Sequence, residues 1–155
     1  MKKAIPLFVV CLLLFAFCAC VEKYNKTLDL LGASFSWDMN HEQAKAFIDQ
    51  NKVNAKMIEI KDYDSFSSVT DGYYTIRFNK MGKIDVVTIN TGSNSPDQWL
   101  AYLISMYGNY DKMDTIENDN YYTWYGKLAE KRCRMVFHTN HTLKTCYINF
   151  RRDES

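Results

Sequence analysis

The sequence predicts an α+β fold, a duplicated α-β-β-β unit that forms an antiparallel sheet with two helices packed on one face. Three observations lead to this fold class. Two segments carry helix-capping residues followed by an apolar stripe, and runs of alternating apolar and polar residues follow each of them. Glycine and other turn residues separate those runs. A displacement of 59 positions superimposes the two hairpins, because Phe78 falls on Phe137 and Ile89 on Ile148.

The amino terminus has the parts of a cleaved secretion signal. Lys2 and Lys3 form its positive region, and an apolar run from Ala4 to Ala19 follows them. Pro6 interrupts this run, which is also shorter than the roughly 20 apolar residues that a membrane-spanning helix needs. Residues 1–19 are therefore predicted to be a signal peptide.

The end of this signal resembles a lipobox, in which a small residue precedes the cysteine that receives lipid. Ala19 takes the small position before Cys20, and Phe17 stands where leucine is usual, as in the looser lipoboxes of the Bacteroidota. We expect Cys20 to carry the palmitate-containing anchor, with plain secretion as the alternative. The mature chain is then predicted to be held in the cell envelope, most simply at the outer membrane, facing the periplasm or the cell surface.

Composition and charge indicate one domain without a nucleic-acid partner. Loss of the two signal lysines leaves 17 basic against 18 acidic residues, and the one basic cluster lies at 131–134. Binding to nucleic acid needs more clustered cations than this. Residues 35–152 are long enough for a single domain, made of two repeats at about 35–92 and 93–152. A lipid-anchored tether and docking segment, residues 20–34, precedes it.

The first repeat is predicted from a helix-capping pattern. A polar tether over Val21–Thr27 and an apolar docking segment from Leu28 to Trp37 come before it. Asn40 and Gln43 form a capping box, which predicts a helix that begins after Asn40 and ends near Asn51. The buried face of this helix is expected to carry Ala44, Phe47 and Ile48. The strands expected after it are Met57–Ile60, Tyr73–Asn79 and Ile84–Asn90.

The second repeat follows the same order of elements. Ser95 as the cap, Pro96 at the first helical position and Gln98 predict a helix start, and Gly108 predicts its end. The stripe expected to be buried consists of Leu100, Leu103, Ile104 and Tyr107. The strands expected after this helix are Tyr121–Tyr125, Arg132–His138 and Leu143–Phe150.

Two cysteines remain for the fold once the signal is removed and Cys20 carries lipid. Cys133 and Cys146 lie in adjacent predicted strands. A two-residue turn at Thr139-Asn140 would place them opposite each other and permit a disulfide, which an oxidising compartment favours. A four-residue turn would place Cys133 opposite Ile148 and leave two buried thiols. Both alternatives stay open at the level of sequence.

Strand alternation assigns the remaining side chains to two faces of the sheet. One face is apolar and should be covered by the helices. The opposite face is rich in tyrosine and arginine, which are enriched at binding hot spots. We expect it either to dock a protein partner or to be a solvated face whose side chains stabilise one another. The candidate binding residues on it are Tyr73, Arg77, Tyr121, Tyr125, Arg132, Arg134 and Tyr147.

The sequence contains no recognisable motif for catalysis, a cofactor or a metal. It has no phosphate loop, no dinucleotide fingerprint and no Gly-x-Ser-x-Gly elbow. His138 and His141 lack a third metal ligand, and loop carboxylates such as Asp62 and Asp64 lack the spacing of a calcium loop. We therefore expect a protein that is not an enzyme and that uses no cofactor and no metal.

A helix followed by three strands, written twice behind a lipobox, resembles small Bacteroidota lipoproteins of unknown function. The residues that carry the resemblance are Phe35–Met39, Met106-Tyr107-Gly108 and Tyr122-Thr123-Trp124. The architecture is similar to the tandem repeats of β-lactamase inhibitor protein and, in each half, to SmpA/BamE outer-membrane assembly lipoproteins. The resemblance implies an α+β fold and a habit of binding proteins.

Three functions are compatible with these observations. The first is a lipid-anchored envelope module that engages a protein partner through its open sheet face. The second is an inhibitor or immunity lipoprotein that blocks an enzyme or a toxin. The third is a structural lipoprotein that binds glycan or peptidoglycan.

Overall fold

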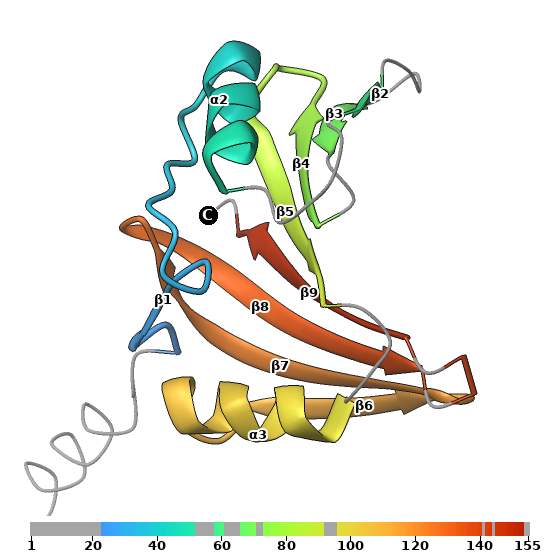
Figure 1. The fold of residues 1–155 in the computed structure, drawn as a ribbon. Helices are drawn as coiled ribbons and strands as arrows, with labels where there is room; N and C mark the ends of the chain where they lie inside the picture. The colour runs from blue at the N-terminus through green and yellow to red at the C-terminus, as the bar shows by residue number, and fades with distance from the viewer. Residues whose placement is uncertain are drawn as a thin grey trace, which may run out of the picture.

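The computed structural model describes residues 23–51, 58–60, 66–70, 73–91, 96–140, 142–143 and 145–153. Within these ranges the chain forms an α+β fold of two helices and a mostly antiparallel nine-stranded sheet (Figure 1). Several sequence predictions lie outside the described residues: the signal peptide, the lipid attachment at Cys20, the helix cap Ser95, and the loop residues Asp62, Asp64 and His141.

The sheet brings the two halves of the chain side by side. Its strands are β1 (Lys26–Leu28), β2 (Ile58–Ile60), β3 (Phe66–Thr70), β4 (Tyr74–Asn79), β5 (Ile84–Asn90), β6 (Lys112–Ile116), β7 (Asp119–Leu128), β8 (Lys131–Asn140) and β9 (Thr145–Arg152). They follow the order β1-β7-β8-β9-β5-β4-β3-β2, and β6 also pairs with β7. The pair of β1 with β7 is parallel and the other pairs are antiparallel. The final strand β9 therefore joins the two halves at β5.

Six of these strands lie close to their predicted positions, and β1, β3 and β6 were not predicted. The prediction of a polar tether over Val21–Thr27 is wrong from Lys26 onward, because Lys26–Leu28 pairs with β7. The side chain of Lys26 is fixed there by an ion pair of 2.6 Å with Asp111. Pairing with the sheet thus anchors a sequence whose composition suggested a solvated linker.

The first helix, α2 (His41–Asn51), begins where the capping box predicts. The backbone N–H of Asn40 donates to Gln43 Oε1, and the N–H of Gln43 donates to Asn40 Oδ1, both at 2.9 Å. These bonds satisfy backbone donors that the first turn of a helix leaves free. The predicted residues Ala44, Phe47 and Ile48 are buried.

The second helix, α3 (Pro96–Tyr107), also ends where the sequence predicts. Gly108 adopts a φ of 72° and its N–H donates to the Ile104 carbonyl at 2.9 Å, which is the glycine-terminated helix end expected from its position. Leu103 and Tyr107 are buried, whereas Leu100 and Ile104 are only partly buried against the core. Figure 1 shows α3 beside β6 and β7, and α2 at the end of the molecule that holds β4 and β5.

The core is formed by the apolar face of the sheet together with residues of both helices and the N-terminal segment. From the predicted docking segment, Leu28 to Trp37, the core receives Leu28, Leu30 and the almost completely buried Trp37. Its indole Nε1 donates to the Leu128 carbonyl at 2.7 Å. This bond ties the segment before α2 to the end of β7.

Of the two alternatives for the remaining cysteines, the disulfide is wrong and the pair of buried thiols is confirmed. The register of β8 and β9 places Cys133 opposite Arg152 and Cys146 opposite Thr139. Both cysteines are free thiols and both are buried. The physical reason is the length of the hairpin, since its strands continue to a pair between Asn140 and Thr145 and shift the register beyond both predicted turns.

Both thiols are expected to be unreactive in the folded protein. Cys133 is fully buried, and burial raises the pKa of its thiol to about 12, so almost no thiolate forms at pH 8. Brief treatment of the full chain with iodoacetamide, followed by peptide mapping, should leave Cys133 and Cys146 unmodified until guanidinium unfolds the protein. Modification of either residue at the same rate before and after unfolding would contradict this expectation.

Candidate binding face

The open face of the sheet is organised in three rows that cross the central strands. Residues directly opposite one another on adjacent strands belong to one row and point to the same side. The arginine row consists of Arg77, Val86, Arg151, Arg134 and Tyr125. The polar row consists of Thr75, Thr88, Asn149, Val136 and Thr123. The aromatic row consists of Asn90, Tyr147, His138 and Tyr121.

A hollow of about 420 Å³, here called the central hollow, spans all three rows. Strands β4, β5, β9, β8 and β7 each contribute to its walls, so it lies across the junction of the two halves. Its lining residues are Thr75, Arg77, Val86, Thr88, Tyr121, Arg134, Val136, His138, Tyr147, Asn149 and Arg151. The volume falls within the range of about 300–1,000 Å³ that is usual for ligand sites.

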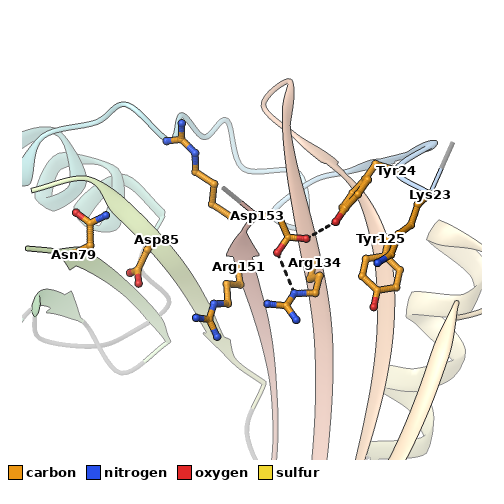
Figure 2. A pocket seen from close by; sticks show the side chains of 9 residues that line it. Lys23, Tyr24, Asn79, Asp85, Tyr125, Arg134, Arg151 and Asp153 are labelled. Carbon is orange, nitrogen blue, oxygen red and sulfur yellow. Dashed lines mark hydrogen bonds and ion pairs between the residues drawn. The ribbon is translucent and has the colours of Figure 1, made fainter. Parts of the chain in front are cut away.

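A second hollow of about 630 Å³, the terminal hollow, adjoins the first at the arginine row. Arg134 and Arg151 line both hollows, and the N-terminal segment contributes Lys23 and Tyr24 (Figure 2). The other lining residues are Asn79, Asp85, Tyr125, Arg152 and Asp153. The two hollows together carry five cationic side chains and two carboxylates, in a chain whose mature part is close to neutral.

Asp153 links Arg134 to the N-terminal segment. The Tyr24 hydroxyl donates to Asp153 Oδ2 at 2.6 Å, and Arg134 Nε lies 3.1 Å from Asp153 Oδ1 (Figure 2). The hydrogen bond to this carboxylate, and secondly burial, raise the pKa of Tyr24. Both carboxylate oxygens are thus engaged, which fixes the direction of the Arg134 side chain.

Arg77 is held by a second carboxylate, at the other end of the arginine row. Its Nε donates to Asp85 Oδ1 at 3.0 Å and its Nη2 donates to Asp85 Oδ2 at 2.6 Å. This two-pronged arrangement orients the guanidinium plane. Two of the three arginines in the row therefore have a carboxylate neighbour.

The third arginine, Arg151, has no hydrogen bond or ion pair within the part of the chain that the structure describes. The register places it directly opposite Arg134 on the same face of the sheet. Figure 2 shows its side chain between Asp85 and Arg134, with no marked contact to either. Like charges directly opposite each other destabilise an antiparallel pair, so this is a position that a bound anion would relieve.

The aromatic row is closely packed. The ring centroid of His138 lies 4.7 Å from that of Tyr121 and 4.4 Å from that of Tyr147. His138 is 8 % exposed and its Nε2 lies 3.2 Å from Asp119 Oδ1, and neither ring nitrogen makes a hydrogen bond with a described residue. Burial, followed by Tyr121 and Asp119, raises the pKa of Tyr147, so its hydroxyl stays protonated and able to donate.

The structure brings most of the predicted binding residues together. Arg77, Tyr121, Arg134 and Tyr147 line the central hollow, and Tyr125 lines the terminal hollow beneath Lys23, whose Nζ lies 4.0 Å from the Tyr125 ring centroid.

Two predicted binding residues do not join this group. Tyr73 precedes β4 and packs edge-on against Tyr74, with ring centroids 4.8 Å apart. Arg132 lies over the Tyr24 ring and lines a separate hollow with Lys83 and Lys131.

Arg151 and His138 are site residues that the sequence predictions missed. The predicted last strand ended at Phe150, one residue before Arg151, although the alternation of Tyr147 and Asn149 continues to it. The predicted strand ended at His138, beside the expected turn, whereas β8 continues to Asn140 and therefore encloses His138. Longer predicted strands would have included both residues, because each continues the alternation of open-face and core-face side chains along its strand.

The described residues contain no group of three or more His, Cys, Asp or Glu side chains that could share a metal ion. Neither helix of the described part is long and apolar enough to cross a membrane. Comparisons of the chain with protein-family models, with curated proteins and with solved structures found no match.

Proposed function

We propose that this protein is a non-enzymatic binding module of the cell envelope, held at a membrane by lipid on Cys20, and that its open sheet face engages a protein partner. The observation that carries the proposal is the arginine row. Arg151 stands opposite Arg134 in a hollow of ligand size and has no hydrogen bond or ion pair with any described residue. Arginine and tyrosine are also the residue types most enriched at binding hot spots.

The position of the N-terminal segment supports this arrangement. Lys23 and Tyr24 line the terminal hollow, and Lys23 comes three residues after the proposed lipid attachment at Cys20. A chain of three residues reaches at most about 11 Å. An anchor at Cys20 would therefore present the binding face close to the membrane surface, where envelope partners assemble.

We further propose that the two halves arose by duplication of a helix-and-strands unit, with both helices covering the same apolar face. The register between β5 and β9 supports this. Ile89 and Ile148 correspond at a displacement of 59 residues, and they lie opposite each other across the junction. The pairs on either side of them are Thr88 with Asn149 and Asn90 with Tyr147, which the same displacement interchanges. The central hollow then lies on the local twofold axis that relates the repeats.

Photo-crosslinking from the face tests the proposed function. A crosslinking amino acid replaces Val136, which lines the central hollow, in the full chain expressed in its own envelope. We expect one discrete protein adduct, which should disappear when Arg134→Gln and Arg151→Gln are added. An adduct with an enzyme or a toxin would identify the protein as an inhibitor.

The matched control places the crosslinker at Ala101, an exposed position on α3. The proposed function predicts that this position gives no such adduct. Identical adducts from the two positions, or none from Val136, would overturn a protein-docking role for the face.

A further inference from the structure

The spacing of the arginine row suits a series of carboxylates. Adjacent strands lie about 4.8 Å apart, so Arg134 and Arg151 are one strand spacing apart and Arg77 lies two spacings beyond Arg151. Arg77 and Arg134 are oriented by Asp85 and Asp153, whereas Arg151 is free to rotate toward a ligand. A planar guanidinium binds a carboxylate through two parallel hydrogen bonds, which makes arginine well suited to this recognition.

The aromatic row distinguishes between two kinds of acidic ligand. Sugars bind aromatic side chains chiefly through the faces of exposed rings. Here the His138 ring is 8 % exposed and lies between Tyr121 and Tyr147, whose rings are tilted by 34° and 44° from its plane. The rings therefore cover part of one another's faces, and the hydroxyl groups of Tyr121 and Tyr147 can donate to the carbonyl groups of a peptide.

The polar row lies between these two regions and offers further hydrogen-bonding groups. Thr88 donates its hydroxyl to Asn149 Oδ1 at 2.7 Å, which leaves the amide NH₂ of Asn149 directed away from that bond. Val86 and Val136 add apolar surface beside it. This combination of amide, hydroxyl and small apolar groups is typical of a surface that accepts a polypeptide.

We propose that the ligand of the open face is an acidic polypeptide segment, whose neighbouring carboxylates bind Arg151 and Arg134 and whose backbone crosses the polar row toward Tyr147. This inference rests on the proposed function and specifies the chemistry of the partner. The excess of cationic over acidic side chains around the two hollows supplies the charge complementarity.

Fluorescence anisotropy with a labelled hexaglutamate peptide tests this inference on the full chain in detergent. Hexaglutamate should bind and hexaglutamine should not, and added salt should weaken the binding. Arg151→Gln should weaken it roughly tenfold or more, the loss expected when a hydrogen-bonded ion pair is removed. Lys83→Gln removes one exposed positive charge outside both hollows and should leave the affinity unchanged.

The outcomes separate this inference from the proposed function. If Arg151→Gln and Lys83→Gln weaken hexaglutamate binding equally, the binding depends only on net charge and the inference is overturned. Tighter, Arg151-dependent binding of polygalacturonate would also overturn it, in favour of an acidic glycan. If hexaglutamate does not bind but the Val136 adduct still forms, the inference is overturned and the proposed docking function remains. Binding of hexaglutamate without any Val136 adduct would support the acidic site and overturn the proposed function.

Discussion

Replacing Trp124 with alanine is expected to lower the free energy of unfolding by about 3–5 kcal/mol, the usual cost of removing a large buried aromatic side chain. Trp124 is 0 % exposed and is among the largest fully buried side chains of the described core. Its Nε1 donates to the Gly108 carbonyl at 2.8 Å, so the substitution also leaves a helix-terminal acceptor without its partner. The loss is a large fraction of the 5–15 kcal/mol that is typical of a folded domain.

Urea denaturation followed by circular dichroism measures this loss. Trp124→Phe keeps most of the ring volume and removes the hydrogen bond, so its cost should be clearly smaller than that of Trp124→Ala. Tyr102→Ala, on the exposed side of α3, should change stability by about 0.5 kcal/mol or less. Similar midpoints for Trp124→Ala and Tyr102→Ala would show that Trp124 does not join α3 to the sheet.

The helices could be predicted because their signals are local. The capping box at Asn40 and Gln43 involves residues three positions apart, and Gly108 ends α3 through its own backbone conformation. Strands with one buried face were predictable for a similar reason, since alternation along β8 and β9 records which side faces the core. Local chemistry and periodicity thus determined the order of most elements.

The sequence did not reveal features that depend on pairing between distant segments. β1 is three residues long and largely polar, and it is a strand only because β7 offers it a partner. The register of β8 with β9 depends on where their hairpin turns, and an error of a few residues there moved Cys133 away from its true neighbour Arg152.

The candidate site illustrates the same limit. Alternation correctly placed Arg77 and Arg134 on the open face, but it could not show that Arg151 lies between them. That neighbourhood arises because β9, the last strand in the chain, pairs with β5 from the first half. The arginine row therefore depends on the order of strands in the sheet. The amino-acid pattern can predict which arginines lie on the open face, but not which of them are neighbours.

Replacing Gly126 with alanine is expected to detach β1 from the sheet. A Cβ atom at Gly126 would lie 2.5 Å from the Lys26 carbonyl oxygen and 2.8 Å from Leu28 Cγ. Overpacking commonly costs about 1–3 kcal/mol, and the upper end applies here because a backbone atom cannot rotate away. Release of β1 also removes the ion pair between Lys26 and Asp111 that holds this segment beside β7.

Loss of β1 should extend to the binding face, because the same segment carries Tyr24 to its hydrogen bond with Asp153. Hydrogen–deuterium exchange of the Gly126→Ala protein should show rapid exchange over Lys26–Leu28, with β8 and β9 still protected. Lys127→Ala, one residue further along β7, adds no atom toward β1 and serves as the control. Full protection of Lys26–Leu28 in the Gly126→Ala protein would mean that β7 can move to admit the methyl group. In that case the absence of a side chain at Gly126 would not be what allows the N-terminal segment to join the sheet.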